Sequence, residues 1–363
     1  MIKNYYMTYN EFNVGVYKSQ VIDTLNFYNS LGSSFTLIAL LPFKGYFKHR
    51  KWIKHLYPNS KVFPAIPSLR LLFINAIYLF FIKSNSNIIC RGSITTFLAL
   101  HFKKKFRKVI YDARAAIAEE HKEYGNGEKY KKLLEIEKIV VFNADFKLSV
   151  SDELIKYWQN KFQYNRGEDI VIPCCAAERK SVNISINDPF FENIVVVFSG
   201  STHPWQSFPL NCTFIEQVLL THKNVNVLFL SKKNTEIESL ISKYGSCKVK
   251  CLWVKEDEVS NYLSKCDYGL LLRDNNITNR VSAPVKFAEY LNSGLDVIIS
   301  PSIKDYSYFV SEHSCGHIWN FGDSIPVLTK NMRKKNNKLL CEKYFTRGGD
   351  ANIDKINEVL SLL

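Results

Sequence analysis

The 363-residue sequence lacks the cysteine patterns of zinc-binding and disulfide-rich proteins. Its nine cysteines are scattered, Cys174 and Cys175 are adjacent, and no C-x-x-C pair is repeated. Zinc sites and disulfide frameworks both need regularly spaced cysteines, so the pattern excludes both classes. We expect reduced thiols that pack as small apolar groups, as in a protein of the cytoplasm.

Long hydrophobic runs are also missing. The N-terminal segment MIKNYYMTYNEFN has no apolar core and no cleavage site, so no signal peptide is expected there. The longest apolar stretch, Leu69–Ile82, is interrupted by Arg70 and Asn75 and falls short of the roughly 20 residues that span a bilayer. A buried helix is the favoured interpretation of this stretch, and a membrane-inserted helix is the alternative.

Acidic residues are too few to balance the basic ones, and the formal net charge is +14. This sign favours anionic partners, but it does not choose among nucleic acid, an acidic membrane surface and phosphorylated small molecules. An apolar fraction of 46% together with the length of the chain favours a folded protein of two domains.

Short β-branched runs alternate with longer segments of helical period, which is typical of parallel α/β domains. In the first half we predict strands at Phe35–Leu41, Asn87–Cys90, Lys108–Asp112, Phe146–Val150 and Asp169–Ile172, and helices at Tyr17–Ser30, Leu69–Ile82, Gly127–Phe142 and Ser151–Phe162. In the second half we predict strands at Ile194–Phe198, Val225–Leu230, Val249–Trp253, Tyr268–Leu272 and Val297–Ser300, and helices at Phe214–Thr221, Thr235–Tyr244, Val259–Lys265 and Val285–Ser293.

The polar segment from Glu178 to Asn193 is the expected linker between the two series. It gives domains of residues 1–185 and 186–363, and the final helix could pack back on the first domain. We expect two doubly wound, Rossmann-like domains that face each other across a cleft, at the carboxyl ends of both sets of strands.

The most specific segment is RDNNITNRVSAPVKFAEYLNSGLDVIIS, from Arg273 to Ser300. It indicates a strand end, a polar loop, a helix that ends at Gly294 and a further strand. This segment resembles the nucleotide-binding signature of GT-B glycosyltransferases, especially the family-4-like group. The resemblance implies that Glu289 accepts hydrogen bonds from the donor ribose, a role that suits a carboxylate.

The same resemblance implies that Lys286, with Arg280, neutralises the donor diphosphate, and that Arg273 belongs to the donor site. Two positions depart from the family pattern. Val281 stands where many members have a second glutamate, which leaves the contact with the donor sugar unassigned, and Asp296 replaces the usual proline. A solvated surface pair of Lys286 and Glu289 is the alternative interpretation.

The segment FSGSTHPWQSFP, from Phe198 to Pro209, follows a buried strand. Its resemblance to the same enzymes implies that Gly200 and Ser201 let the backbone approach phosphate or sugar, with Trp205 and Gln206 beside the donor. A simple turn whose tryptophan covers the core is an equal alternative. His203 is a candidate for catalysis or sugar contact, although a lone loop histidine usually does neither.

The expected acceptor domain contributes further candidates. Gly15 is expected at a strand-to-helix turn where the chain passes close to the donor, and Tyr17 and Lys18 after it are expected to bind the acceptor. Arg91 and Arg114 follow strands and could hold an acceptor pyrophosphate, and a general base could be Asp112, Glu119 or Glu120. An ordinary ion-pair network is an equal alternative for these residues.

No D-x-D motif occurs, so we expect no metal and no other cofactor, because basic side chains and a helix N-terminus stabilise the leaving diphosphate in GT-B enzymes. Two basic clusters, Phe43–Tyr57 and His101–Lys108, interleave lysine and arginine with aromatic residues. They suit an anionic membrane surface or a nucleic-acid backbone, and a solvated basic face is the third possibility.

The sequence therefore predicts a bacterial glycosyltransferase that moves a sugar from a nucleotide-sugar donor, with UDP as the expected nucleotide. The expected acceptor is a lipid-linked glycan or an oligosaccharide in capsule or O-antigen synthesis, at the inner face of the membrane. The family resemblance implies retention of anomeric configuration. A nucleotide-sugar epimerase of the same architecture and a nucleic-acid-binding protein are the alternatives, although no nucleic-acid-recognition module is found.

Overall fold

The computed structural model describes residues 2–11, 14–125, 127–165, 167, 169–177 and 186–363. The chain forms two compact units: Met1–Pro173 with Ala351–Leu363, and Cys174–Asp350. The first unit thus ends before the polar segment that we expected to be the linker, because Cys174–Ala177 pack in the second unit. Residues 178–185 of that segment lie outside the described part of the chain.

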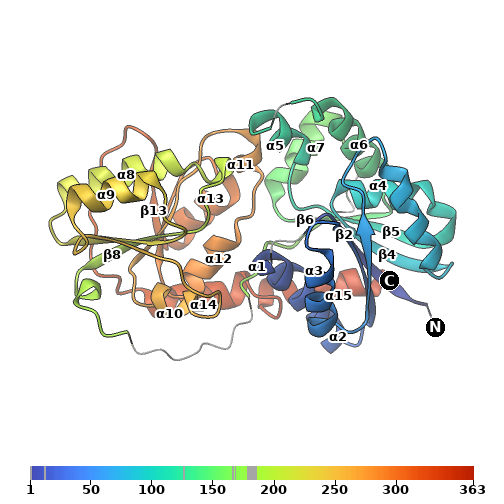
Figure 1. The fold of residues 1–363 in the computed structure, drawn as a ribbon, viewed down its shortest axis with the longest axis horizontal. Helices are drawn as coiled ribbons and strands as arrows, with labels where there is room; N and C mark the ends of the chain where they lie inside the picture. The colour runs from blue at the N-terminus through green and yellow to red at the C-terminus, as the bar shows by residue number, and fades with distance from the viewer. Residues whose placement is uncertain (1, 12–13, 126, 166, 168, 178–185) are drawn as a thin grey trace. The chain divides into compact units, whose positions relative to one another are not determined.

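The first unit is built on a parallel sheet of seven strands in the order β3-β2-β1-β4-β5-β6-β7 (Figure 1). The strands are β1 (Asn4–Tyr9), β2 (Phe35–Pro42), β3 (Ser60–Ala65), β4 (Ser86–Arg91), β5 (Phe106–Asp112), β6 (Phe146–Ser149) and β7 (Asp169–Val171). The order reverses between β1 and β4, and β5 lies next to β4, so the carboxyl ends of these three strands come together.

Helices cover both faces of this sheet, because successive strand residues point to opposite sides. They are α1 (Val14–Tyr17), the π-helical turn η1 (Lys18–Ile22), α2 (Asp23–Ser30), α3 (Tyr46–Leu56), the 3₁₀ helices η2 (Leu72–Phe81) and η3 (Lys103–Lys105), α4 (Ser93–His101), α5 (Ile117–Glu123), α6 (Tyr130–Asn143), α7 (Asp152–Phe162) and α15 (Asp350–Ser361). Tyr6 and Leu37 pack on one face with η1, α2, α3 and α15, whereas Tyr5 and Ile38 pack on the other with η2 and α4.

The second unit repeats this plan with a parallel sheet of six strands in the order β10-β9-β8-β11-β12-β13 (Figure 1). The strands are β8 (Ile194–Ser199), β9 (Val225–Leu230), β10 (Val249–Leu252), β11 (Tyr268–Leu271), β12 (Asp296–Ile299) and β13 (Gly316–Ile318). Its helices are the 3₁₀ turns η4 (Pro189–Glu192) and η5 (Pro204–Gln206), α8 (Phe208–Thr221), α9 (Thr235–Tyr244), α10 (Val259–Leu263), α11 (Ile277–Arg280), α12 (Val285–Asn292), α13 (Lys304–His313) and α14 (Lys334–Tyr344).

Most predicted elements are present. The predicted strand Val225–Leu230 and helix Thr235–Tyr244 have the bounds observed for β9 and α9, and the Ser151 side chain caps α7 by accepting a hydrogen bond from the Leu154 amide at 3.1 Å. Two predictions are wrong in detail. Gly15 lies within the helical turn α1 rather than in the turn before a helix, and the stretch Leu69–Ile82 is not a buried helix.

That apolar stretch forms the 3₁₀ helix η2, which buries only part of its side chains. Leu72, Ala76 and Leu79 are buried, but Phe73, Ile77 and other apolar neighbours are exposed to solvent. The side chains alternate between sheet and solvent because the element lies against one face of the sheet rather than inside a layer. In the described part of the chain, no helix is long and apolar enough to cross a membrane.

Candidate functional site

The candidate site of the second unit centres on the N-terminal half of α12. The Lys286 ammonium lies 2.7 Å from the Glu289 carboxylate and 3.3 Å from the Ser199 hydroxyl at the end of β8. The helix thus brings a cation and a carboxylate, three residues apart, to the carboxyl end of a buried parallel strand. Within the described residues no side chain caps this helix, and the Phe287 amide of its first turn donates to the Pro284 carbonyl at 3.0 Å.

Close packing fixes the position of α12 on the sheet. The Tyr290 ring lies against β11, where a Cβ atom on Gly269 would come within 2.3 Å of it. The buried Tyr290 hydroxyl donates to the Leu270 carbonyl at 3.3 Å and accepts from the Ser199 amide at 3.1 Å. Burial raises the pKa of Tyr290, so the hydroxyl stays protonated and keeps both bonds. Lys286 and Glu289 are therefore held by a rigid support.

Two loop segments complete this end of the sheet. Arg273, just after β11, is buried, and its guanidinium donates to the side-chain carbonyl of Gln206. The backbone amide of Arg273 donates to the Ser300 hydroxyl at 2.8 Å, and its carbonyl accepts from the Ser302 hydroxyl at 2.9 Å. The structure thus joins Arg273 and Gln206, which lie far apart in the sequence, in a single contact.

The loop after β8 is open. An added Cβ atom at Gly200 would have no neighbour closer than 3.8 Å, so space is left beside the backbone there. Ser201 and His203 are exposed, and the His203 ring stacks on Trp205 with ring centroids 4.6 Å apart. Trp205 is 37% exposed, and the ring that stacks on it belongs to an exposed loop residue. The pair forms a flat aromatic surface next to Gln206.

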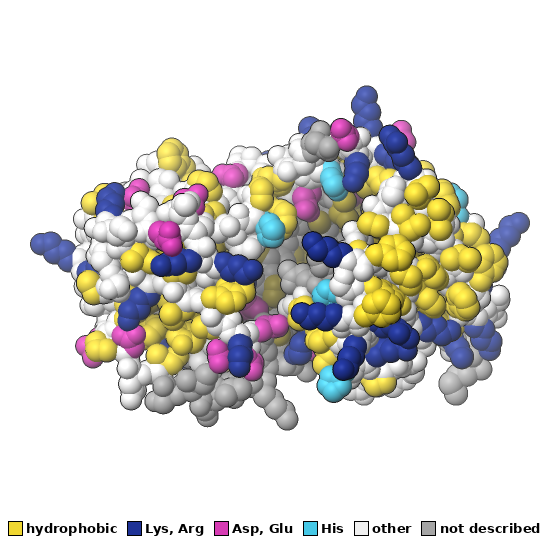
Figure 2. Space-filling model, viewed as in Figure 1, with side chains coloured by type: hydrophobic (Ala, Val, Ile, Leu, Met, Phe, Trp, Pro, Cys, Tyr) yellow, Lys and Arg dark blue, Asp and Glu magenta, His cyan; other side chains and the backbone are white. Residues whose placement is uncertain are grey.

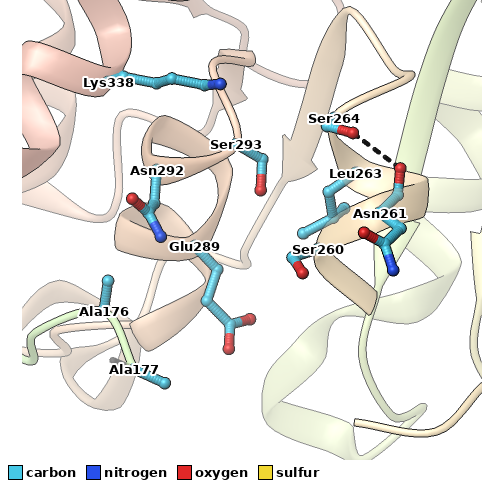
Figure 3. Close-up of a pocket in the computed structure, with 10 residues that line it drawn as sticks. All are labelled: Ala176, Ala177, Ser260, Asn261, Leu263, Ser264, Glu289, Asn292, Ser293 and Lys338. Carbon is cyan, nitrogen blue, oxygen red and sulfur yellow. Dashed lines mark hydrogen bonds between the residues drawn. The ribbon is translucent and has the colours of Figure 1, made fainter. Parts of the chain in front are cut away.

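A pocket of about 380 Å³ opens between α12, α10 and α14 (Figure 3). The Glu289 carboxylate extends from α12 toward the short helix α10, which carries Ser260 and Asn261 (Figure 3). Within the described residues the Ser260 hydroxyl and the Asn261 side-chain amide nitrogen are buried without hydrogen-bond partners. Such a pocket offers a carboxylate acceptor and two unsatisfied polar groups to a polar ligand.

In the first unit, the polar side chains at the strand ends pair with one another. Asp112 at the end of β5 is buried, accepts from Tyr6, and lies 2.8 Å from the Arg114 guanidinium. The Arg91 guanidinium is held by Glu11 at 2.7 Å and lies 3.9 Å from Asp112. Burial and the charge of Asp112 raise the pKa of Tyr6, which keeps its hydroxyl a donor. The ion-pair alternative therefore describes the geometry of this cluster.

The two glutamates proposed as bases lie in α5 and differ from each other. Glu119 is fully buried and accepts from the Tyr157 hydroxyl at 3.1 Å, with the Lys161 ammonium at 3.2 Å. Glu120 is half-buried, and burial together with the charge of Glu123 raises its pKa. Glu119 thus belongs to the packing between α5 and α7.

The remaining candidates do not gather at one place. Tyr17 is buried in the core of the first unit, where its hydroxyl lies 3.0 Å from that of Thr8. Lys18 is half-buried in η1, and Arg280 is exposed at the end of α11. In the described part of the chain no group of three or more histidine, cysteine, aspartate or glutamate side chains is placed to hold a metal ion.

Sequence analysis missed several residues of the candidate site: Ser199, Tyr290, Ser260 and Asn261. Ser199 could have been found, because it directly precedes Gly200 at the end of a predicted strand. Ser260 and Asn261 carry no such signal, since only the fold places α10 beside α12.

No protein-family model and no curated protein matches this chain. Solved structures do match it at low identity over its full length. Sucrose-phosphate synthase from Thermosynechococcus elongatus is 12% identical with a TM-score of 0.69. The match covers 100% of this chain and 99% of the synthase chain. The Anabaena protein Alr3699/HepE, in complex with UDP and glucose, is 14% identical with a TM-score of 0.67, and covers 100% of both chains.

The chain has the GT-B fold. The prediction of an α/β protein with two parallel, doubly wound sheets is thereby confirmed. A GT-B fold does not by itself define the reaction. A Listeria monocytogenes protein assigned as a UDP-N-acetylglucosamine 2-epimerase also matches, with 9% identity, a TM-score of 0.54, and coverage of 93% of this chain and 86% of its own.

Proposed function

We propose that the protein is a glycosyltransferase whose second unit binds a nucleotide-sugar donor, with UDP as the expected nucleotide. The observation that carries this proposal is the contact of Lys286 with both Glu289 and Ser199 at the end of β8. It puts a cation for a diphosphate and a carboxylate for a ribose diol within one short stretch of surface.

A bound donor would contact Lys286 and Glu289 with two different parts of its structure. A diphosphate lying at the open backbone of Gly200 would draw the Lys286 ammonium, while the ribose hydroxyls would donate to Glu289. The pocket beside Glu289 is large enough for part of a nucleoside, since ligand sites begin near about 300 Å³. Its hydroxyl and amide at Ser260 and Asn261 would contact that nucleoside.

The chemistry that follows is the departure of the nucleoside diphosphate from the sugar. The negative charge that develops on the leaving group would be stabilised by Lys286 and by the positive end of the α12 dipole. Arg273 lies at the neighbouring strand end and adds a second cation. In this proposal the reaction needs no metal, and the anomeric configuration is retained.

The proposed acceptor is a lipid-linked or free glycan of a bacterial surface polysaccharide, bound by the first unit. Arg91 and Arg114 are the proposed groups for an acceptor pyrophosphate. Because Glu11 and Asp112 already neutralise them, an acceptor would have to replace these contacts in part. His203, Asp112 and Glu120 remain the proposed catalytic side chains.

The test is calorimetric binding of UDP, GDP, CDP and ADP without added metal, to the wild type and to Glu289→Gln. We expect one diphosphate to bind selectively and the variant to lose about tenfold or more in affinity, as for a hydrogen bond to a charged group. Glu216→Gln is the matched control, because Glu216 of the same unit pairs with Lys243 at 2.9 Å.

If no nucleotide binds, or if Glu289→Gln binds as well as the wild type, the proposed donor site is wrong. The nucleotide that binds is then tested as its sugar conjugates, with and without an acceptor glycan. Release of the nucleotide only with an acceptor supports transfer. Conversion of the sugar without an acceptor would instead establish an epimerase.

A further inference from the structure

The helix η2 (Leu72–Phe81) and the residue before it carry a ridge of apolar side chains that point into solvent. The exposed members are Leu71, Phe73, Ile74, Ile77, Phe80 and Phe81. Phe80 is 73% exposed and Ile77 is 57% exposed, so these are not edges of core residues. Contiguous apolar surface of this kind is rare on soluble proteins and marks an interaction site.

Aromatic rings attach this ridge firmly to the first unit. Phe63 of β3 stacks on Tyr78 with centroids 4.5 Å apart and on Phe81 at 5.5 Å. On the other side, Phe73 contacts His101 of α4 at 4.7 Å. Asn75 of η2 accepts from the Ile66 amide at 2.9 Å. The exposed side chains therefore project from a fixed platform.

The surroundings of the ridge are strongly basic. Between Asp23 and Asp112 the sequence contains no aspartate or glutamate, but it contains 14 lysine and arginine residues, a number equal to the net charge of the whole chain. Two lysines contact η2: Lys61 donates to the Phe81 carbonyl at 2.9 Å, and Lys105 lies 5.6 Å from the Phe80 ring centre. A third, Lys132, donates at 3.0 Å to the carbonyl of Leu69, just before η2.

We propose that η2 and these lysines form a membrane-docking face, in which the apolar ridge enters an anionic lipid surface and the lysines contact the headgroups. Apolar insertion and electrostatic attraction to anionic lipid act together in peripheral membrane proteins. Figure 2 shows hydrophobic side chains gathered on the first unit, with lysine and arginine side chains along one border of them.

The chemistry of the ridge distinguishes a bilayer from the other anionic partner considered, nucleic acid. A phosphate backbone would use the lysines, and unpaired bases would stack on aromatic rings. Neither gives a reason to expose the aliphatic side chains of Leu71, Ile74 and Ile77. The acyl boundary of a bilayer takes up aliphatic and aromatic side chains alike.

This inference goes beyond the proposed sugar transfer, because it uses no residue of the second unit and holds whatever reaction the protein performs. If both are right, the acceptor is delivered in the plane of the membrane. A nucleotide-binding measurement on each variant separates the two, since a change in η2 should leave binding of UDP unaltered.

The experiment is sedimentation of the full chain with vesicles of phosphatidylcholine, alone or mixed with phosphatidylglycerol. The wild type should bind the mixed vesicles and not the neutral ones. Ile77→Ser with Phe80→Ser should weaken that binding about tenfold or more, because two inserted side chains are lost. Leu220→Ser with Tyr308→Ser is the matched control, since both residues are 70% exposed and lie in the second unit.

The lysines are tested by Lys61→Gln, Lys105→Gln and Lys132→Gln together, which should weaken binding about tenfold or more and reduce its dependence on salt. Thermal unfolding of each variant shows whether it is folded. The proposal is overturned if the wild type ignores anionic vesicles, or if the serine pair binds them as the wild type does. It is also overturned if RNA binds more tightly than vesicles and the serine pair leaves the binding of RNA unchanged.

Discussion

The carboxyl ends of the two sheets carry similar side chains that are used in opposite ways. At β5, Asp112 is buried and pairs with Arg114, and Glu11 pairs with the neighbouring Arg91, so the charges of this cluster balance one another. At β8, Lys286 and Glu289 pair at 2.7 Å beside an open glycine and a pocket. The difference lies in what surrounds the pair. A closed cluster stabilises a fold, and an open one leaves its charges available to a ligand.

The largest effect should come from breaking the closed cluster. Asp112→Asn leaves the Arg114 guanidinium without its carboxylate partner, while Arg91 keeps Glu11, so the free energy of unfolding should fall by about 3 kcal/mol. Urea unfolding measures the loss. Glu153→Gln, which breaks an exposed pair with Lys156 at 2.8 Å, should change stability by less than about 1 kcal/mol. An equal change in both variants would show that the cluster at β5 is not closed.

Glu137, a second buried carboxylate of the first unit, sharpens the comparison because burial outweighs the neighbouring charges in setting its pKa. Glu137 is buried and accepts from Trp158, and burial raises its pKa to about 7. Its stabilising effect is complete below the ordinary pKa of 4.5 and is lost as the pH rises through 7. Glu137→Gln should therefore match the wild type at low pH and exceed its stability above neutrality by about 3 kcal/mol.

The measurement for Glu137 is the free energy of unfolding as a function of pH. The control is Glu135→Gln, because Glu135 is exposed on the same helix. A parallel pH profile for the wild type and Glu137→Gln would show that folding does not raise the pKa of Glu137.

The open pair is tested by separating its two charges. Lys286→Gln should weaken UDP binding by about 2 kcal/mol, since a charge-assisted contact with the diphosphate is lost, and should leave uridine binding unchanged. Glu289→Gln should weaken both ligands, because both contain the ribose. Lys243→Gln, whose lysine pairs with Glu216, is the control. Equal losses for UDP and uridine in Lys286→Gln would contradict the assignment of Lys286 to the diphosphate.

The smallest effect is expected at Gly200. A methyl group there would have no neighbour closer than 3.8 Å, so Gly200→Ala should leave stability within about 0.5 kcal/mol of the wild type. The methyl group would occupy the proposed diphosphate path and weaken UDP binding by about 1 kcal/mol. At Gly269 the added carbon would lie 2.3 Å from the Tyr290 ring, so Gly269→Ala should destabilise the second unit instead. Unfolding curves of both variants measure the stability, and calorimetric titration measures the binding of UDP.

Much of the fold could be predicted from the sequence, because apolar runs such as Ile194–Phe198 are typical of buried parallel strands. Strand β1 was missed because NYYMTY has no Val, Ile or Leu, although it lies in the middle of its sheet. Strand β3 was missed because it contains Lys61 and Pro64, and proline is tolerated only in edge strands. The structure places β3 at the edge of its sheet.

The candidate site was predictable only in part. The spacing of Lys286 and Glu289 within one helix predicts their contact, as the structure shows. The contact of Tyr6 with Asp112 joins residues 106 positions apart, and no local pattern indicates it. The apolar stretch at η2 was predicted to be buried because its composition is hydrophobic. Composition does not show that one side of the element has no neighbour to cover it.

The helix α15 also determines the order in which the protein can be built. Ile356 and Val359 belong to the same core as Tyr17 and Leu25, and Lys355 donates to the Val171 carbonyl at 3.1 Å. The first unit is therefore discontinuous in the chain, and the second is inserted into it. During synthesis the core of the first unit stays incomplete until α15 has been made, which happens only after the whole of the second unit has been synthesised.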